Sequence, residues 1–321
     1  MGLSLVFVAV SVIVFGKGLA PPDPPPGVDL QQVEVPDPGH RPLPLLLWQP
    51  RAGTNTPRAV IVISHGAGGS KVDHADTAMA LAQAGFVVAA IEHAGDNYRD
   101  SSGRLPDRPR QVVRVLDYLL GEWSGRSRID AGRIGIFGFS AGGFTALVLA
   151  GAEPDLSRGG AYCRQRPLAW TCAYLRQRGI DPSHPAEQPA AWVHDPRIRA
   201  AAIVAPAIGY SFTAPGLANV RLPIQLWTAQ DDQVVEDSPA LIANLLPTKP
   251  VPIVAPSAGH FAFMAPCSWQ KRLLIRALHS LRGTEEICSD ALGFDRPAFH
   301  AKFNRKIVDF FTTQLGVPLR R

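Results

Sequence analysis

One serine stands in a sequence setting that is typical of a nucleophile. Gly138-Phe139-Ser140-Ala141-Gly142 is a Gly-x-Ser-x-Gly motif between an apolar run and a stretch of small residues. A serine at a sharp strand-to-helix turn has a strained backbone, and its neighbours two positions away must lack side chains to avoid collision. The turn holds the hydroxyl at a helix N-terminus, where partial positive charge favours an oxyanion. The motif predicts Ser140 as a nucleophile, and the alternative is a glycine-rich turn with a capping serine.

A histidine must activate this serine, because a hydroxyl is a weak nucleophile at neutral pH. In this kind of site the chain order is serine, then acid, then histidine. His260 follows a late apolar run in a Gly-His turn. His184 and His194 fall in an irregular segment, and His279 and His300 fall in helical patterns. We therefore predict His260 as the base.

Two adjacent carboxylates end the preceding apolar run, at Asp231 and Asp232. Adjacent residues cannot both point at one imidazole, so only one of them orients the histidine. We predict Asp232 in this role, with Asp231 as the alternative. The other carboxylate would cap the helix that begins near Ser238.

Acyl-transfer chemistry also needs backbone N–H donors for the negatively charged oxygen of its intermediate. One donor would be the amide of Ala141, directly after the serine. The glycine-rich segment 64–70 follows an early apolar run, and we predict the Ala67 amide as the second donor. His65 in this segment is expected to be a structural hydrogen-bonding residue. The lysine and hydroxyl spacing of a phosphate-binding loop is missing here.

The elements that must position these residues alternate along the chain. Short apolar, β-branched runs predict buried strands at 59–64, 86–91, 133–139, 200–204, 223–228 and 251–254. Helical patterns lie between and after them, at 73–84, 109–122, 141–150, 238–246, 268–281 and 296–315. The β-α-β-α order predicts an α/β protein with one doubly wound, mostly parallel sheet covered by helices on both faces.

Segment 151–196 interrupts this alternation. It is rich in Arg, Pro, Gly and His and contains Trp170 and Trp192. An irregular insertion of this length in a compact domain is usually a lid or a binding loop. We expect a lid-like insertion, and the alternative is a surface excursion without a role in substrate binding.

Four motifs together resemble one branch of the α/β-hydrolases. They are Ser-His-Gly-Ala-Gly-Gly at 64–69, Gly-Phe-Ser-Ala-Gly-Gly at 138–143, Asp-Asp-Gln-Val-Val at 231–235 and Ala-Gly-His-Phe-Ala-Phe at 258–263. Over most of residues 59–315 the chain resembles the predicted dienelactone hydrolases and the proteins similar to platelet-activating-factor acetylhydrolase. True dienelactone hydrolases have a cysteine where this chain has Ser140.

This resemblance implies an α/β-hydrolase fold in which Ser140, Asp232 and His260 form a catalytic triad, with the Ala67 and Ala141 amides as the oxyanion hole. It implies hydrolysis of carboxylic esters without a metal or an organic cofactor. An acyltransferase or amidase would use the same triad. A binding protein on a hydrolase scaffold is a further alternative, although such proteins usually lose a triad residue.

Aromatic and aliphatic side chains next to these motifs bear on the substrate. Phe139, Phe261, Phe263 and Met264 either line an apolar acyl or alcohol pocket or belong to the ordinary core. An apolar pocket under a lid would suit short-chain or phospholipid-type esters. We therefore expect a small-molecule ester or lipid substrate and allow for transient contact with a membrane surface.

The N-terminus indicates a compartment. Residues 3–15 are almost entirely apolar, and small residues and a proline-rich stretch at 21–26 follow them. The run is too short for a typical membrane-spanning helix, which needs about 20 residues, and it resembles a signal peptide cleaved near Ala20. We expect an exported protein, periplasmic or secreted, with an uncleaved anchor as the alternative. The expected organisation is a signal peptide at 1–20, a proline-rich segment with a first strand at 21–58, and a hydrolase domain at 59–321.

The cysteines agree with export. The chain has four, at positions 163, 172, 267 and 288, and an even number in an exported protein suggests disulfides. Of the three possible connectivities we favour Cys163–Cys172 with Cys267–Cys288. The spacing does not fit a structural zinc site.

Composition excludes several other classes of protein. The 321 residues are 46% hydrophobic and only 18% charged, which is unlike a disordered or coiled-coil protein. The net charge is +5, and no nucleic-acid-binding motif accompanies it. The modest arginine cluster at positions 104, 108, 110 and 114 is expected to be a solvated helix face, and the alternative is a site that attracts anionic substrates.

Overall fold

An eight-stranded sheet forms the centre of the molecule, in the order β1-β2-β4-β3-β5-β6-β7-β8. The computed structural model describes residues 20–51, 56–177, 179–181, 189–236, 238–282 and 287–317. Strand β2 is antiparallel to both of its neighbours, and all other pairs are parallel. The strands are β1 (Val28–Val35), β2 (Leu43–Pro50), β3 (Arg58–Ser64), β4 (Val87–Ile91), β5 (Ile129–Phe139), β6 (Ile198–Val204), β7 (Ile224–Ala229) and β8 (Ile253–Ala255).

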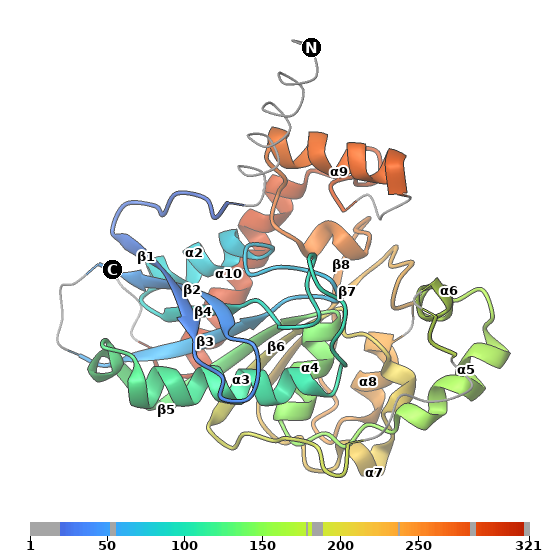
Figure 1. Ribbon diagram of the computed structural model, residues 1–321, viewed down its shortest axis with the longest axis horizontal. Coiled ribbons are helices and arrows are strands. Elements are labelled where there is room, and N and C mark those ends of the chain that lie inside the picture. Colours follow the sequence, from blue (N-terminus) through green and yellow to red (C-terminus); the bar gives the residue numbers. More distant parts are fainter. Residues whose placement is uncertain are drawn as a thin grey trace.

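Helices cover both faces of this sheet (Figure 1). On one face lie α2 and α10, and on the other lie α3, α4 and α8. The helices are α2 (Ala75–Ala84), α3 (Asp107–Asp117), α4 (Ala141–Leu149), α5 (Gly159–Gln165), α6 (Trp170–Gln177), α7 (Ala214–Leu217), α8 (Ser238–Leu245), α9 (Trp269–Arg282) and α10 (Arg296–Gln314). The prediction of an α/β protein with a mostly parallel, doubly covered sheet is confirmed.

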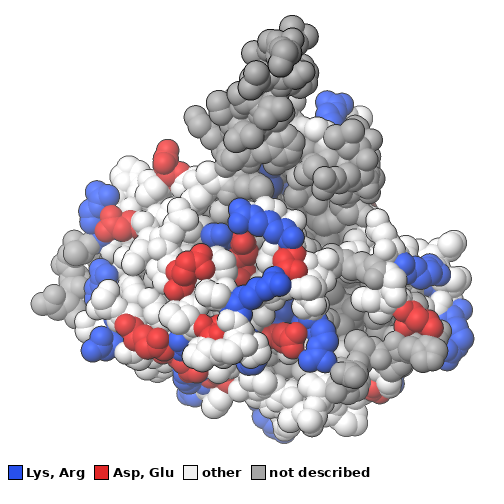
Figure 2. All heavy atoms as spheres, in the orientation of Figure 1, with Lys and Arg blue, Asp and Glu red and all other residues white. Residues whose placement is uncertain are grey.

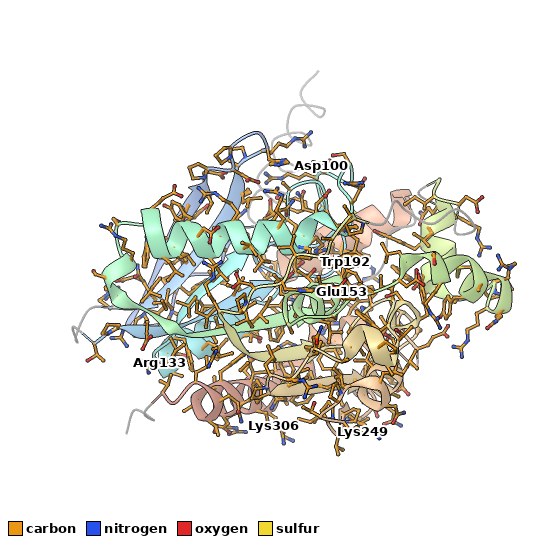
Figure 3. All side chains as sticks on the ribbon, turned by 90° about the horizontal axis from the view of Figure 1, so that it is seen from below. Asp100, Arg133, Glu153, Trp192, Lys249 and Lys306 are labelled. Carbon is orange, nitrogen blue, oxygen red and sulfur yellow. A yellow bond between two sulfur atoms is a disulfide. The ribbon has the colours of Figure 1, made fainter. Side chains whose placement is uncertain are left out.

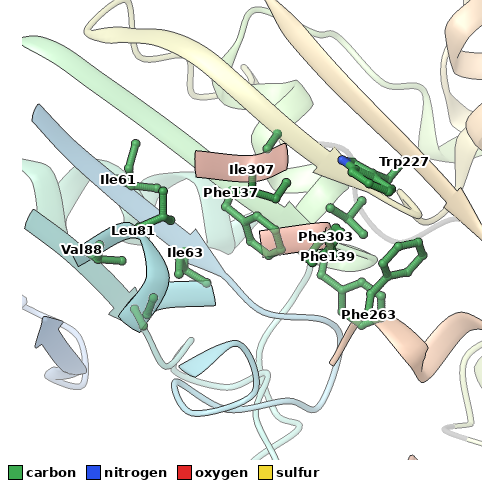
Figure 4. Close-up of a cluster of buried hydrophobic side chains, with 14 of the residues drawn as sticks. Ile61, Ile63, Leu81, Val88, Phe137, Phe139, Trp227, Phe263, Phe303 and Ile307 are labelled. Carbon is green, nitrogen blue, oxygen red and sulfur yellow. The ribbon is translucent and has the colours of Figure 1, made fainter. Parts of the chain in front are cut away.

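Each face of the sheet has its own apolar core. The core under α2 and α10 is built around aromatic side chains (Figure 4). The ring of Trp227 packs edge-on against Phe303, and the ring of Phe263 packs against Phe303 in a tilted arrangement. The core under α3, α4 and α8 is mainly aliphatic. Because the central strands are buried on both faces, their sequences are apolar throughout rather than alternating.

The first two strands are an addition to the expected pattern. The sequence predicted a single strand within 21–58, but β1 and β2 both lie there and pair with each other over their whole length. Strand β2 then continues the sheet through β4. The predicted signal peptide at 1–20 lies almost wholly outside the described residues. No helix in the described part of the chain combines the length and the apolar character that crossing a bilayer requires.

The insertion at 151–196 contains two short helices, α5 and α6, which lie beside the sheet rather than on it (Figure 1). A disulfide between Cys163 and Cys172, with Cα atoms 5.6 Å apart, joins them. Further along, the indole of Trp192 donates a hydrogen bond of 3.0 Å to the Pro154 carbonyl, beside Glu153 (Figure 3). The second disulfide joins Cys267 to Cys288, so the pairing is the one that the sequence favoured.

Candidate active site

Ser140 occupies a sharp turn between β5 and α4. Its backbone has φ 54° and ψ −115°, a strained conformation for a residue with a side chain. The turn is locked because the Ser140 amide donates to the Val204 carbonyl at 2.9 Å and its own carbonyl accepts from the Ala207 amide at 3.0 Å. The hydroxyl therefore stands at the N-terminus of α4, at the carboxyl end of the central strand.

The backbone around the motif leaves no room for a side chain at either of its two glycines. A Cβ on Gly138 would overlap the Gly142 carbonyl oxygen, and a Cβ on Gly142 would overlap the Ser64 carbonyl oxygen. Both obstacles are backbone atoms, which cannot rotate away as a flexible side chain would. The close approach brings the end of β3 directly against the first turn of α4.

The loops after β7 and β8 bring a carboxylate and an imidazole together. The Gln230 amide donates to Ala255 O at 3.0 Å and the Asp231 amide donates to Ala258 O at 2.9 Å, which ties the two loops to each other. As a result Asp232 Oδ2 lies 2.9 Å from His260 Nδ1. Both side chains are nearly inaccessible, at 1% for Asp232 and 2% for His260.

The other oxygen of Asp232 is also satisfied. Asp232 Oδ1 accepts hydrogen bonds of 2.9 Å from the amides of both Val234 and Val235. Burial alone would raise the pKa of Asp232, but the hydrogen bond and charge of His260 and these two amides outweigh it and lower the pKa. Asp232 is therefore a carboxylate that is fixed in position. Its neighbour Asp231 is exposed, and among the described residues its side chain makes no capping bond to α8.

The imidazole also lies close to the end of β5. The ring of Phe139 lies 4.8 Å from that of His260, measured between centroids, which places the residue before Ser140 against this imidazole. Among the described residues no hydrogen bond joins Ser140 Oγ to His260 Nε2. Such bonds are often long before a substrate binds and tighten in the Michaelis complex.

The glycine-rich loop between β3 and α2 lies on the other side of Ser140. A Cβ built on Gly66 would lie 3.4 Å from the Ser140 Cβ. In the described structure neither the Ala67 amide nor the Ala141 amide donates a hydrogen bond to a protein acceptor. These are the two amides that the sequence suggested as oxyanion donors, and both are free to bind a ligand oxygen.

His65 in this loop is fully enclosed. Its Nδ1 lies 2.6 Å from the Gly66 carbonyl oxygen and its Nε2 accepts from the His93 amide at 3.1 Å. Burial and the charge of Arg108 lower the pKa of His65 to about 4. His65 is therefore a neutral side chain that donates from Nδ1 and accepts at Nε2, in the structural role that the sequence predicted.

The arginine cluster is not simply a solvated face, and for Arg108 that prediction is wrong. Arg108 is buried and paired with Asp96, whereas Arg110 pairs with Asp37. Figure 2 shows that basic and acidic side chains are interspersed on this face rather than gathered by sign. The sequence did contain the signal, because Arg108 shares the spacing i, i+3, i+4, i+7 with the buried residues of α3, Gln111, Val112 and Val115.

Three of the four apolar residues that flank the motifs belong to the core. Phe139, Phe263 and Met264 are 3%, 0% and 6% exposed and pack with the aromatic core, whereas Phe261 is only partly buried. Among the alternative histidines, His300 is also enclosed and bonds to Asp76 and to the Ala262 carbonyl. His194 bonds to the Ala152 carbonyl, His184 lies outside the described residues, and the side chain of His279 is not described.

No three His, Cys, Asp or Glu side chains in the described ranges gather closely enough to hold a metal ion. A surface hollow of about 450 Å³ lies on the insertion, lined by residues of α5, of α6 and of the segment after α6, among them Arg164, Arg176 and Asp181. It is formed by the insertion itself, and its lining includes neither Ser140, Asp232 and His260 nor any residue of the glycine-rich loop.

Comparison with known proteins supports the architecture. The family described as "Serine aminopeptidase, S33" matches residues 55–163. A bis(hydroxyethyl) terephthalate hydrolase of Streptomyces coelicolor is 43% identical over 77 residues, which are 24% of this chain and 23% of that protein. Cutinase est1 of Thermobifida alba is 37% identical over 113 residues, 34% of this chain and 36% of the cutinase. The matches thus span about a quarter to a third of these curated relatives.

Solved structures extend the likeness to the whole fold. A ferulic acid esterase from Streptomyces cinnamoneus superimposes with a TM-score of 0.56 at 16% identity and covers 94% of each chain. A dienelactone hydrolase from Anabaena variabilis superimposes with a TM-score of 0.55, also at 16% identity, over 90% of this chain and 99% of the other. At such identities the likeness concerns the fold. With its sheet order, its serine turn and these matches, the chain has the fold of the α/β-hydrolases that it resembles.

Proposed function

We propose that this protein is a serine hydrolase that cleaves carboxylic esters through an acyl-enzyme intermediate, with Ser140, His260 and Asp232 as its catalytic triad. The observation that carries the proposal is the buried hydrogen bond from His260 Nδ1 to Asp232, formed beside the strained turn of Ser140. A neutral imidazole held in this way keeps Nε2 free to accept a proton.

The reaction follows from these roles. Ser140 Oγ attacks the ester carbonyl carbon while His260 takes its proton, and the resulting oxyanion accepts hydrogen bonds from the Ala67 and Ala141 amides. His260 then returns the proton to the leaving alcohol as the ester bond breaks. Water, deprotonated by His260, attacks the acyl-serine, and His260 returns that proton to Ser140 Oγ as the acid is released. Asp232 holds the tautomer and stabilises the imidazolium.

The names of the relatives suggest which esters to test. The matched proteins include a hydrolase of a terephthalate ester and cutinases. A small-molecule carboxylic ester is accordingly the proposed substrate class, and short-acyl phospholipids belong in the same panel. The insertion with α5 and α6 is proposed as a lid, because Arg166 pairs with Glu236 at 2.8 Å and so connects it to the loop that follows Asp232.

Labelling with a fluorophosphonate, together with hydrolysis of p-nitrophenyl acetate and butyrate, tests the proposal. We expect the wild type to be labelled and active, and Ser140→Ala to lose the label and at least about 10³-fold in kcat. Ser102→Ala, which changes an exposed serine, is the matched control and should retain both. A folded wild type that neither reacts with the probe nor hydrolyses any ester would refute the proposal.

An amidase or acyltransferase would share the acyl-enzyme. The family description names an aminopeptidase, so aminoacyl anilides and an added alcohol acceptor belong in the same assay. Faster release of the anilide than of the matching ester, or transfer of acyl groups to the alcohol in preference to water, would replace ester hydrolysis by one of these activities.

We also propose export from the cytoplasm. All four cysteines are engaged in disulfides, and such bonds persist in oxidising compartments. The apolar N-terminal run is the proposed signal peptide for this export.

A further inference from the structure

A buried ion pair lies directly behind the loop that carries Ala67. Arg108, from the first turn of α3, pairs with Asp96 at 2.7 Å. The Arg108 side chain is 1% exposed and that of Asp96 is 14% exposed. Neither residue belongs to the proposed triad. An isolated ion pair at such depth contributes little to stability, because desolvation offsets the attraction. The contacts of this pair instead fix the position of the loop.

The pair forms hydrogen bonds with the loop on both sides of Ala67. Arg108 Nη2 donates a hydrogen bond to the His65 carbonyl. Asp96 uses Oδ2 for Arg108 and Oδ1 to accept from the Gly68 amide at 2.9 Å. The peptide unit before Gly66 and the one after Ala67 are therefore both fixed by the same two side chains.

The peptide unit between these anchors contains the Ala67 N–H. Its carbonyl, that of Gly66, accepts from the Gly69 amide at 3.1 Å and lies 2.6 Å from His65 Nδ1. In a planar trans peptide the N–H points opposite to the C=O. The Ala67 N–H is thus directed away from His65 and Gly69, and Gly66 itself lies against Ser140.

We propose that Arg108 and Asp96 are positioning residues that fix the direction of the Ala67 N–H toward the oxyanion. This inference rests on the proposed function, and it adds a specific pair of residues to that site. Burial lowers the pKa of Arg108 and Asp96 opposes this effect. Because a guanidinium has so high an intrinsic pKa, Arg108 stays protonated at neutral pH, and the pair remains charged throughout catalysis.

The substitution Arg108→Lys tests the inference, because lysine keeps the charge but cannot hold the His65 carbonyl and Asp96 with one planar fork. We expect kcat for p-nitrophenyl acetate to fall about 10²-fold, the effect of losing one oxyanion donor, while KM changes less than about twofold. Affinity for a boronic acid that mimics the tetrahedral intermediate should fall together with kcat.

A second buried pair supplies the matched control. Arg296 pairs with Asp290 at 2.7 Å with exposures of 2% and 14%, nearly those of Arg108 and Asp96. Arg296→Lys should cost similar thermal stability but leave kcat within about twofold of the wild type. If Arg108→Lys lowered kcat no more than Arg296→Lys does, the inference would be overturned.

Hydrogen exchange separates this inference from the proposed function. Amide exchange in a peptide covering 64–72 should accelerate about tenfold or more in Arg108→Lys and remain unchanged in Arg296→Lys. This measurement does not depend on turnover, so a wild type without esterase activity would refute the function while the exchange still decides whether the pair holds the loop. Unchanged exchange in Arg108→Lys overturns the inference. If that variant does not fold, Asp96→Asn replaces it, with the same two readouts and the same criteria.

Discussion

At the scale of single residues, the site depends on backbone contacts that only glycine permits. The end of β3 and the start of α4 approach so closely that the Ser64 carbonyl fills the space where a Cβ of Gly142 would be. The strained φ of Ser140 is maintained by this packing and by its backbone hydrogen bonds with Val204 and Ala207. The steric constraint that the sequence motif predicted is thus the contact between Gly142 and the Ser64 carbonyl.

A pair of glycine substitutions measures this constraint. Gly142→Ala should lower the free energy of unfolding by about 3 kcal/mol, as overpacking against rigid atoms does, and should greatly reduce esterase activity because Ser140 is displaced. Gly121→Ala is the control, since a Cβ there meets nothing within 4 Å, and it should be neutral or stabilise by about 0.5 kcal/mol. Urea unfolding and p-nitrophenyl acetate hydrolysis provide the two readouts. Equal stability of the two variants would contradict the steric argument.

His74 is a second residue with a measurable consequence. It is buried at the start of α2 and packs against the rings of Phe137 and Phe139, and neither of its ring nitrogens has a hydrogen-bond partner among the described residues. Burial lowers the pKa of His74 from 6.5 to about 4, although the nearby Asp73 and Asp76 oppose the shift and His300 and His65 add to it. The unfolded chain therefore binds a proton between these two pH values that the folded protein does not bind.

This difference in proton binding determines how the free energy of unfolding depends on pH. Stability that His74 contributes is complete above pH 6.5 and is lost as the pH falls toward about 4. Between pH 7.5 and pH 5 the wild type should lose about 2 kcal/mol more of its free energy of unfolding than His74→Leu does. His65 and His93 are unchanged in the variant, so only the difference between the two proteins is informative. Identical pH dependence in urea unfolding would show that His74 is protonated or solvated in the folded state.

The proposed triad could be predicted from the sequence because its chemistry imposes an order and local motifs. The supporting residues could not be found in the same way. Arg108 has a charge that suggests exposure, and its partner Asp96 comes from a loop whose path no periodicity describes. Only the helical spacing of Arg108 with Gln111, Val112 and Val115 shows that it faces inward.

At the scale of elements, the six predicted strands and six predicted helices are all present, with ends that differ by a few residues. Buried parallel strands are continuous apolar runs, so they are easily recognised. Strands β1 and β2 were harder, because β1 carries polar residues on exposed positions and β2 includes prolines at both ends. Prolines within an apolar run weaken the prediction of a strand, and pairing with β4 was not readable from local sequence.

The two disulfides belong to different elements and should act differently. The Cys267–Cys288 bond closes a loop across α9 with a sequence separation of 21, and replacing both cysteines by serine should lower the free energy of unfolding by about 3 kcal/mol in the chain-entropy model. The Cys163–Cys172 bond lies within the insertion, with a separation of 9. Its removal should mainly increase proteolysis around α5 and α6. Limited proteolysis and urea unfolding of the two double variants test this, and a reversed pattern would assign the insertion to the cooperative core.

At the scale of the whole molecule, the first strand of the described part of the chain lies several residues after the apolar N-terminal run. The first strand starts at Val28, and the proline-rich stretch separates it from the predicted cleavage point. Expression in a secretion-competent host should therefore yield a product that starts at or near Pro21, with both disulfides formed. Intact-mass spectrometry of the exported protein, with and without reduction, is the measurement. A cell-associated product that retains residues 1–20 would favour the uncleaved anchor.

The whole-molecule architecture was predictable to the level of the fold, because alternating elements and the serine turn restrict the possible folds. The narrower resemblance to predicted dienelactone hydrolases remains a prediction. The role of the insertion as a lid also remains a prediction. A segment of short helices and loops has no hydrophobic periodicity from which its contacts could be predicted.

The two outermost strands of the sheet have a consequence for how the protein behaves when concentrated. Strand β8 is only three residues long. Strand β1 is longer, but it carries Asp29 and Glu34 among its polar side chains. Short or charged borders discourage one sheet from adding to another. We expect these two edges to disfavour the strand-to-strand association through which one molecule could add to another.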